Sequence, residues 1–273
     1  MFNLTSHDLT DLVALANRLA DAAAKASLPH FRARSLDTEN KEVDGFDPVT
    51  IADRAAEQAM RDVLAVERPN DGVFGEEQER THGTSGLTWV LDPIDGTRAF
   101  ISGLPVWGTL IALDDGAEGR IGVIDQPFTG ERYIGVVDGA QSRALLARDG
   151  QQTPITTRKD VPLAEATVFT TDPYIFEDAA EMACFEAVRD RARLTRYGTD
   201  CYAYALVALG TVDLVIESGL AAYDVASHVP LIRAAGGVVT DWEGNDCRWG
   251  GTALAAGSPE LHEEALELLR SAS

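Results

Sequence analysis

The stretch WVLDPIDGTRAFISGLPVWGTLIAL, which runs from Trp89 to Leu113, places two aspartates, Asp92 and Asp95, directly after an apolar segment. The residues before Asp92 predict a buried strand, and the residues from Gly96 onward predict a helical turn. Asp95 is suited to cap that turn, but this role does not explain why Asp92 is also an aspartate. Because two carboxylates at this spacing repel each other, one would be protonated unless a cation lies between them.

Further acids follow other predicted strands. Glu76 and Glu77 come directly after Gly75 at the end of a short predicted strand, and Asp224 lies in the first turn of a predicted helix. Hard divalent cations such as Mg²⁺ prefer oxygen ligands of this kind, and a substrate phosphate can complete their coordination. The backbone N–H groups at a helix start attract anions, so the Gly-Thr pair after Asp95 predicts a phosphate site. Together these features indicate metal-assisted phosphoryl transfer.

Two other ways of handling phosphate do not fit the sequence. It contains neither GxGxxG nor GxxxxGK[ST], the fingerprints of nucleotide-binding loops. Phosphatases of the haloacid-dehalogenase type use a nucleophilic aspartate in a DxDGT loop, and here Pro93 stands two residues before Asp95, where that nucleophile would be. We therefore expect no covalent aspartyl-phosphate.

The order of the predicted elements bears on the fold class. Helices and strands are neither strictly alternating nor segregated, which favours a layered α/β (α+β) sandwich over a Rossmann sheet. The chain has 273 residues, enough for one large domain or two packed halves. A polar stretch, DGQQTPITTRKDVPL, is predicted to be the crossover between them. We place an N-terminal α+β half with the metal and phosphate site at residues 1–150, and a C-terminal α/β half that completes the substrate pocket at residues 151–273.

Charge and composition narrow the function classes. With 23 Lys and Arg against 44 Asp and Glu, the net charge is −21, which disfavours binding to nucleic acid. No apolar run is long enough to span a membrane, and residues 8–27 have the spacing of an amphipathic helix rather than of a signal peptide. The three cysteines show no paired spacing, so we expect a reducing, cytoplasmic location.

Four motifs in order resemble those of a known family. DPVTIADRAAE, GEE, WVLDPIDGTRAF and YDVASHVPLIRAAGG, which extend from Asp47 to Gly237, resemble the inositol monophosphatase superfamily of Mg²⁺-dependent phosphomonoesterases. The resemblance implies a five-layered αβαβα sandwich of the inositol monophosphatase and fructose-1,6-bisphosphatase type. It also implies a homodimer that acts on a small phosphate ester with two or three Mg²⁺ ions per site, for which we expect Mn²⁺ to substitute.

The resemblance implies a metal role for each acid of the cluster. Glu76, Asp92 and the backbone carbonyl of Ile94 would hold the first, activating Mg²⁺. Asp92, Asp95 and Asp224 would hold the second, and a third, weaker ion would lie near Glu76. Two such ions would activate the attacking water and stabilise the leaving oxygen.

The resemblance also implies catalytic and phosphate-binding roles. Thr97 would orient the attacking water while hydrogen-bonded to Asp53, and Glu76 would take part in catalysis. The backbone N–H groups of Gly96 and Thr97 would bind the phosphate. One departure concerns Lys41, because the segment KEVDGFD is one residue longer than in the family's inositol enzymes.

The identity of the phosphate ester depends mainly on Asp200. The substrate pocket is expected to involve Asp95, Asp200, Glu217 and Asp224, and the family's inositol enzymes commonly have a small residue where Asp200 stands. Asp200 would also suit a helix N-cap, although Thr199 could cap that helix equally well. Two extra acids near the leaving group suit a cationic alcohol, and histidinol phosphate carries an ammonium and an imidazole.

We therefore favour the histidinol-phosphate phosphatase branch, to which GTRAFISGLPVWGTLIAL and DCYAYALVALG are similar. The alternative is an inositol-1-monophosphatase or a broad-specificity sugar or polyol phosphatase. A different class, a protein partner in an RNA-bound complex, would favour a basic face. Arg98 is either a solvated residue or a substrate gate. Tyr202 could stack on an imidazole, whereas Tyr204 and Trp107 are expected in the core.

Overall fold

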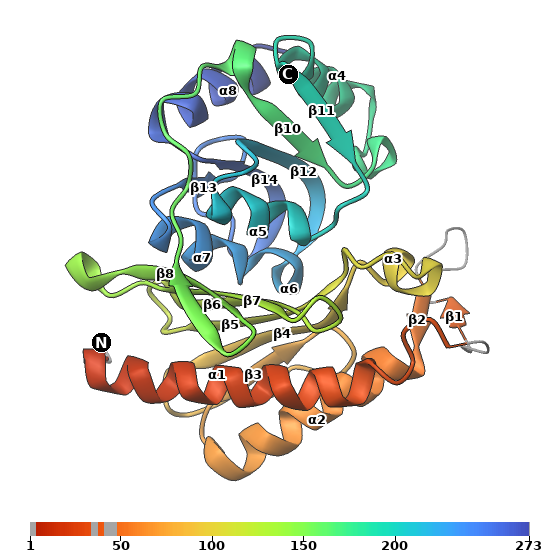
Figure 1. Cartoon of the computed structure of the whole chain (residues 1–273), viewed down its shortest axis with the longest axis vertical. Coiled ribbons are helices and arrows are strands. Elements are labelled where there is room, and N and C mark those ends of the chain that lie inside the picture. The colour runs from red at the N-terminus through yellow and green to blue at the C-terminus, as the bar shows by residue number, and fades with distance from the viewer. Residues whose placement is uncertain (1–3, 34–37, 41–47, 273) are drawn as a thin grey trace.

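The computed structural model describes residues 4–33, 38–40 and 48–272. Within these residues the strands form a seven-stranded sheet in the order β3-β4-β5-β6-β7-β8-β9, a five-stranded sheet in the order β11-β10-β12-β14-β13, and a two-stranded sheet of β1 and β2. Helices lie outside both large sheets and between them (Figure 1). This confirms the predicted αβαβα sandwich.

The larger sheet contains the strands from the middle of the chain. Its neighbours pair antiparallel except for β3 and β4, which pair parallel. Its strands are β3 (Gly72–Gly75), β4 (Thr88–Asp95), β5 (Gly108–Asp114), β6 (Gly119–Gln126), β7 (Glu131–Val136), β8 (Arg143–Arg148) and β9 (Gln151–Pro154). The short antiparallel pair consists of β1 (Thr38–Asn40) and β2 (Pro48–Thr50). The segment DGFDPVT, which the sequence predicts to be a turn or hairpin, lies mostly outside the described residues.

The smaller sheet mixes parallel and antiparallel pairs. Strand β10 pairs parallel with β11 and β12, and β14 pairs antiparallel with β12 and β13. Its strands are β10 (Thr167–Thr170), β11 (Leu194–Tyr197), β12 (Leu214–Ala221), β13 (Val238–Thr240) and β14 (Gly250–Ala256).

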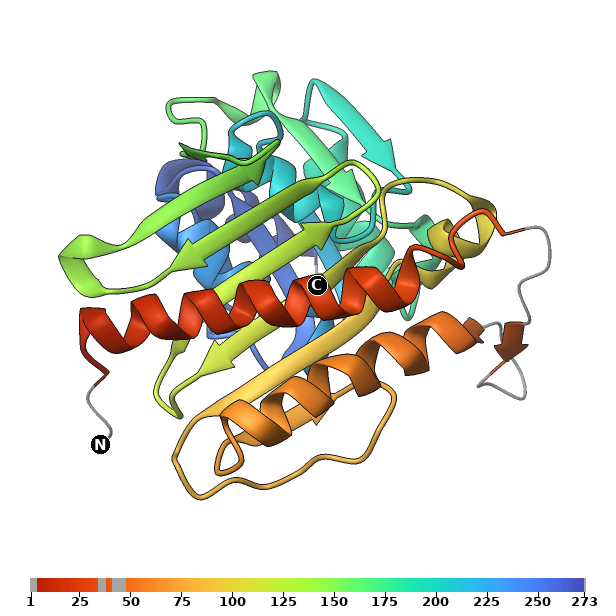
Figure 2. The ribbon, with the colours of Figure 1, turned by 60° about the horizontal axis from the view of Figure 1, so that its bottom comes forward.

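The helices form three layers, one on the outer face of each large sheet and one between the two sheets. Helices α1 (Ser6–Ser27) and α2 (Ile51–Glu67) run side by side over the outer face of the larger sheet (Figure 2). The middle layer contains α5 (Tyr202–Leu209), α6 (Ala222–Val225) and α7 (His228–Ala234). Helices α4 (Ala179–Arg189) and α8 (Pro259–Ala272) pack together over the smaller sheet. Shorter elements are α3 (Thr97–Ser102), η1 (Gly139–Gln141), η2 (Leu163–Glu165) and η3 (Pro173–Ile175).

The outer helices form where the sequence pattern predicts them. Thr5 and Asp8 make a capping box at the start of α1, and Leu12, Leu19 and Ala23 on its buried face recur at helical spacing. A second capping box, of Thr50 and Asp53, starts α2. These helices bury their apolar faces against the larger sheet. This packing holds α2, and with it Asp53, in place on the sheet.

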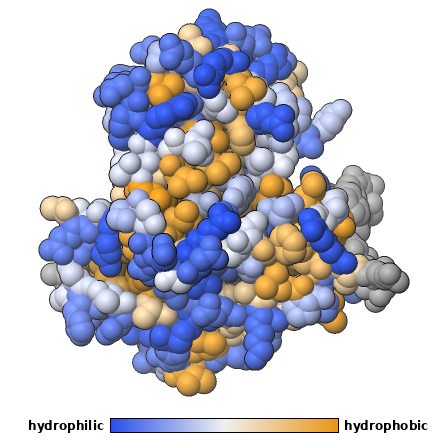
Figure 3. Space-filling model, viewed as in Figure 1, coloured by the Kyte–Doolittle hydropathy of each residue, from blue (hydrophilic) through white to orange (hydrophobic). Residues whose placement is uncertain are grey.

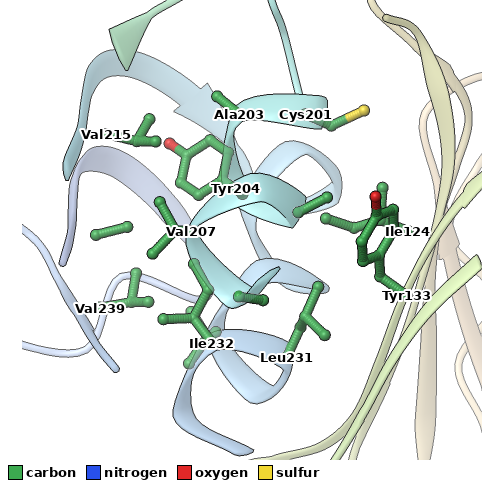
Figure 4. Close-up of a cluster of buried hydrophobic side chains, with 14 of the residues drawn as sticks. Ile124, Tyr133, Cys201, Ala203, Tyr204, Val207, Val215, Leu231, Ile232 and Val239 are labelled. Carbon is green, nitrogen blue, oxygen red and sulfur yellow. The ribbon is translucent and has the colours of Figure 1, made fainter. Parts of the chain in front are cut away.

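The middle layer joins the two sheets through apolar side chains. Tyr133 reaches the cluster from the larger sheet and Val215 from the smaller one, while Tyr204 and Leu231 come from the helices between them (Figure 4). The face shown in Figure 3 is mostly hydrophilic, with apolar residues gathered between the two sheets and over the region of α3. No helix among the described residues combines the length and apolar character needed to cross a membrane.

Two local predictions were right only in part. The stretch predicted as a crossover does lead from the larger sheet to the smaller one, but it begins with strand β9, because Gln151–Pro154 pair with β8 and extend the larger sheet. The segment AAYDVASHVPLIRAAGG, which the sequence predicts to be one helix from Ala221 onward, is interrupted after Val225 and resumes as α7. The proposed boundary after residue 150 lies in the turn between β8 and β9, and the division into two halves stays a prediction.

Candidate active site

A pocket of about 160 Å³ opens where β4 ends. Most of the residues singled out from the sequence meet there, although they come from distant parts of the chain. The lining residues are Glu76, Asp92, Ile94, Asp95, Gly96, Thr97, Arg98, Thr171, Asp200 and Asp224. Asp53 and Glu217, which were also predicted, are not in this lining but contact residues that are.

A bulge in β4 explains why two aspartates three positions apart face the same pocket. Asp92 pairs with Leu110 and Asp95 with Gly108, so β4 has one residue more than β5 over this interval. In a regular strand residues at odd spacing point to opposite faces, and the extra residue cancels that alternation. The bulge is held by a hydrogen bond of 3.0 Å from the Ile94 N–H to Asp92 Oδ1.

Asp92, Asp95 and Asp224 form the acidic centre of the pocket. Each offers a carboxylate oxygen, and the three oxygens lie within 4.8 Å of one another. Burial, followed by the nearby carboxylates of Glu76 and Asp95, raises the pKa of Asp92 well above its usual range. Three crowded carboxylate oxygens of this kind fit a hard divalent cation, which would neutralise their repulsion.

Asp95 and Asp224 are each fixed by a backbone N–H. Asp95 Oδ2 accepts a hydrogen bond of 2.8 Å from the N–H of Cys201, and Asp224 Oδ2 accepts one of 2.7 Å from the N–H of Ala221. Burial and the carboxylates of Asp200 and Asp224 raise the pKa of Asp95 as well. The interpretation of Asp95 as the cap of α3 is wrong, because Gly96 occupies the N-cap position and no side chain caps it.

Thr97 lies between the acidic centre and a buried carboxylate. Its hydroxyl is 3.3 Å from Asp53 Oδ1 and 3.1 Å from the carbonyl oxygen of Ile94, so its single proton has two acceptors within reach. Asp53 is itself fixed, since its Oδ2 accepts hydrogen bonds of 2.8 Å and 2.5 Å from the Thr50 N–H and hydroxyl. The contact predicted between Thr97 and Asp53 is therefore present, and their catalytic role stays a prediction.

Asp200 packs directly against Gly96. A Cβ atom added to Gly96 would lie 3.0 Å from the Cβ and Cγ atoms of Asp200, and Gly96 has a φ of 79°, which favours glycine. Burial and the carboxylate of Glu217 raise the pKa of Asp200 to about 7, against the opposing effect of Arg98. The aspartate thus lies beside the predicted phosphate site and faces the pocket.

Neither residue proposed as the cap of α5 has that role. Cys201 takes the N-cap position and no side chain caps the helix. The Thr199 hydroxyl is buried and has no hydrogen-bond partner within the described chain. Asp200 adopts a φ of 42°, a left-handed conformation that aspartate tolerates better than most residues.

Glu217 lies behind the pocket wall. Its Oε1 accepts hydrogen bonds of 3.0 Å and 2.6 Å from the N–H and hydroxyl of Thr171, and its Oε2 accepts one of 2.8 Å from the Tyr204 hydroxyl. Burial raises the pKa of Glu217. Thr171 therefore separates this carboxylate from the pocket, and direct contact between Glu217 and substrate stays a prediction.

Sequence reasoning missed Thr171, which lines the pocket directly after strand β10. Arg98 also lines the pocket, whereas Lys41 lies outside the described residues. Trp107 and Tyr204 are fully buried, as expected. Tyr202 donates a hydrogen bond to Glu131, which engages its hydroxyl away from the pocket.

Comparisons with known proteins agree with this architecture. The model of the inositol monophosphatase family matches residues 8–273. The chain is 41% identical to the bifunctional phosphatase IMPL2 of Arabidopsis thaliana, over 97% of this chain and 77% of that protein. It is 36% identical to a histidinol-phosphatase of Streptomyces coelicolor, over 96% of this chain and 98% of that protein. The structure of an inositol monophosphatase from Zymomonas mobilis superposes with a TM-score of 0.83 at 41% identity, covering 98% of this chain and 100% of that one.

The layered fold and the acidic pocket are those of a metal-dependent phosphatase. The chain belongs to the inositol monophosphatase family, whose members hydrolyse phosphoric monoesters. This confirms the resemblance drawn from the four motifs and the assignment of the protein to the enzymes that act on small phosphate esters.

Proposed function

We propose that the protein hydrolyses L-histidinol phosphate to L-histidinol and phosphate with Mg²⁺, as a step of histidine biosynthesis. The observation that carries this proposal is Asp200, a carboxylate in the pocket lining beyond the cluster of Asp92, Asp95 and Asp224. A neutral polyol gives no compensation for an additional negative charge in a partly buried pocket, whereas a cationic alcohol does.

The position of Asp200 agrees with contact to the alcohol part of the ester. Because it packs on Gly96, a phosphate held by the N–H groups of Gly96 and Thr97 would place its leaving group near this side chain. Glu217 adds a second negative charge behind Thr171. An ammonium or imidazolium group in this part of the pocket would reduce the repulsion between the two acids.

The chain's own residues have separate tasks in the proposed reaction. Asp92, Asp95 and Asp224, with Glu76 and the Ile94 carbonyl, would hold the Mg²⁺ ions, for which we expect Mn²⁺ to substitute. When bound, such ions polarise the phosphoryl oxygens and stabilise the charge that develops during in-line displacement.

Thr97 orients the attacking water in this proposal. When the Thr97 hydroxyl donates its proton to Asp53, its lone pairs remain to accept a hydrogen bond from water. Asp53 is held by two hydrogen bonds from Thr50 and cannot turn away. The pair thus fixes the direction of the water before it attacks the phosphorus.

The relatives support two candidate substrates. Histidinol-phosphatases are among the proteins about one third identical to this chain over nearly its whole length. The similar Zymomonas mobilis structure is that of an inositol monophosphatase, so inositol 1-phosphate, or another sugar or polyol phosphate, is the second candidate. Asp95, Asp200 and Asp224 can accept hydrogen bonds from polyol hydroxyls, which is the observation that favours it.

A phosphate-release panel distinguishes these candidates. Histidinol phosphate, inositol 1-phosphate, 3′-phosphoadenosine 5′-phosphate and fructose 1,6-bisphosphate would each be assayed with Mg²⁺ and with excess chelator. We expect the highest kcat/KM for histidinol phosphate and no activity with chelator. A higher kcat/KM for inositol 1-phosphate would replace the first candidate with the second.

We further propose that the enzyme is a homodimer in the cytoplasm. Light scattering coupled to size exclusion measures the mass of the assembly against the 29.3 kDa of one chain. A role as a protein partner in an RNA-bound complex is the non-enzymatic alternative. It predicts a salt-dependent shift of RNA on a native gel, whereas the net charge of −21 predicts no shift.

A further inference from the structure

We propose that Glu57 and Arg61 of α2 are positioning residues that hold the segment Gly75–Gln78, here called the Glu76 loop, in the geometry needed to bind a divalent cation. The proposal rests on the metal role proposed for Glu76 and does not depend on which ester is the substrate. Neither Glu57 nor Arg61 is in the pocket lining, so they act through the loop and not on the substrate.

Glu57 is a fully buried carboxylate that links α2 to the Glu76 loop. Its Oε2 accepts a hydrogen bond of 2.7 Å from the N–H of Glu77, and its Oε1 accepts one of 2.7 Å from Nε of Arg61. A buried carboxylate requires partners of this kind for both oxygens. The position of Glu77 is therefore tied to the helix.

Arg61 extends the contact along the same loop. Its Nη2 donates a hydrogen bond of 3.2 Å to the carbonyl oxygen of Gln78, while Nη1 lies 3.5 Å from the Thr81 hydroxyl. On the other side, the N–H of Glu76 donates to the carbonyl oxygen of Leu91, at 3.2 Å, and joins the loop to β4. The loop is thus held between α2 and the strand that carries the acidic centre.

Gly75 shows how closely the carboxylate approaches. A Cβ atom at this position would lie 2.3 Å from Glu57 Oε1, which is a steric clash. Glycine has no Cβ atom and therefore fits here. This contact connects two sequence motifs, since Glu57 ends DPVTIADRAAE and Gly75 begins GEE. Neither Glu57 nor Gly75 belongs to the metal cluster. The close contact between them explains why each motif has this residue.

The consequence for the site is that the backbone at Glu76 is held from both sides. Its carboxylate lies close enough to Asp92 to contribute to the raised pKa of that residue. The neighbours of Glu76 in the chain are Gly75, packed on Glu57, and Glu77, hydrogen-bonded to it. Partners that orient a metal ligand in this way commonly change metal affinity by about 10–100-fold when they are removed.

The test substitutes Glu57→Gln and measures Mn²⁺ binding by electron paramagnetic resonance on the full chain. The amide keeps the shape, but its NH₂ group faces either the Glu77 N–H or the Arg61 guanidinium, so one hydrogen bond becomes a contact between two donors. Glu67→Gln is the matched control, because Glu67 ends the same helix and pairs with exposed Arg18 far from the loop.

We expect Glu57→Gln to weaken Mn²⁺ binding by about tenfold, and to raise the Mg²⁺ concentration needed for half-maximal activity in proportion. At saturating Mg²⁺ its KM for substrate should equal that of the wild type. Glu67→Gln should match the wild type in both measurements. A purely structural role for Glu57 predicts a lower Tm with unchanged Mn²⁺ binding, and that result would overturn the proposal.

Two further variants cover the remaining outcomes. If Glu57→Gln does not fold, Arg61→Lys decides by the same criterion, because it keeps the charge opposite Glu57 but loses the fork that reaches Gln78. Glu76→Gln is the reference for loss of the ligand itself. Unchanged Mn²⁺ binding in Glu76→Gln would overturn both the positioning role of Glu57 and Arg61 and the metal role of Glu76. Weak Mn²⁺ binding in Glu76→Gln together with normal Mn²⁺ binding in Glu57→Gln would overturn the positioning role alone.

Discussion

Asp200→Asn is the substitution that separates the two candidate substrates most sharply. The amide has nearly the same shape as the carboxylate and tolerates the left-handed backbone at this position, where φ is 42°. The packing of the side chain on Gly96 should therefore be retained. The variant removes one negative charge from the pocket and changes little else.

The size of the effect follows from the contact that would be lost. A hydrogen bond to a charged group contributes about 1.5–3 kcal/mol, and each 1.4 kcal/mol corresponds to about tenfold, so kcat/KM for histidinol phosphate should fall by about 10–100-fold. Glycerol 2-phosphate, which lacks a cation, should be spared. The ratio of the two kcat/KM values is the quantity to measure by phosphate release.

The ratio of the two kcat/KM values should also depend on pH. The groups that act on Asp200 are Glu217 and Asp172, which raise its pKa, and Arg98, which lowers it, and the pKa of Asp200 is about 7. Since only the ionised form attracts a cation, the wild-type ratio should rise as the pH increases through about 7, and the variant should show no such rise. The assay is therefore best run well above this pH.

Asp172→Asn is the matched control for a change in net charge alone. Asp172 influences the pKa of Asp200 but is not part of the pocket lining, and its Oδ1 accepts the N–H of Tyr174. We expect its ratio to remain close to that of the wild type. An equal fall for both substrates in Asp200→Asn would refute the reasoning and leave Asp200 a structural acid.

Three further outcomes test the metal and water assignments. Asp92→Asn should abolish phosphate release while leaving the Tm of the metal-free protein equal or higher, because it relieves repulsion between carboxylates; substantial residual activity would contradict the assignment. Thr97→Ala should reduce kcat by about 10²–10⁴-fold without changing the Mg²⁺ concentration for half-maximal activity, and an unchanged kcat would remove Thr97 and Asp53 from the mechanism. Mg²⁺ should raise the Tm more at alkaline than at acid pH. Because the pKa values of Asp92 and Asp95 are raised in the fold, protonation of these residues stabilises the metal-free protein as the pH falls. The bound protons then compete with Mg²⁺ for the same carboxylates. Equal shifts in Tm at both pH values would contradict this competition.

The acidic centre could be predicted from the sequence because its residues follow apolar strand or helix signals. Asp92 and Asp95 are recognisable by their unusual spacing, and the bulge that makes both face the pocket is the physical reason for that spacing. Asp53 was identified through the resemblance. The structure adds that Asp53 also caps α2, which explains how it is fixed.

Contacts between segments distant in sequence could not be predicted in this way. Nothing in the local pattern indicates that Glu57 touches Gly75, or that Thr171 shields Glu217, because these contacts depend on how helix, loop and strand pack in three dimensions. The extra strand β9 was missed for a related reason. Its residues are polar and exposed, so they lack the apolar alternation that identifies a strand, and backbone pairing with β8 defines it instead.

The most direct test of the proposed specificity is a crystal structure of the enzyme with Mg²⁺, phosphate and histidinol bound. We predict phosphate at Gly96 and Thr97, the ions at Asp92, Asp95 and Asp224, and a nitrogen of histidinol within about 2.7–3.2 Å of the Asp200 carboxylate. A complex in which the amino and imidazole groups both point away from Asp200 would contradict it.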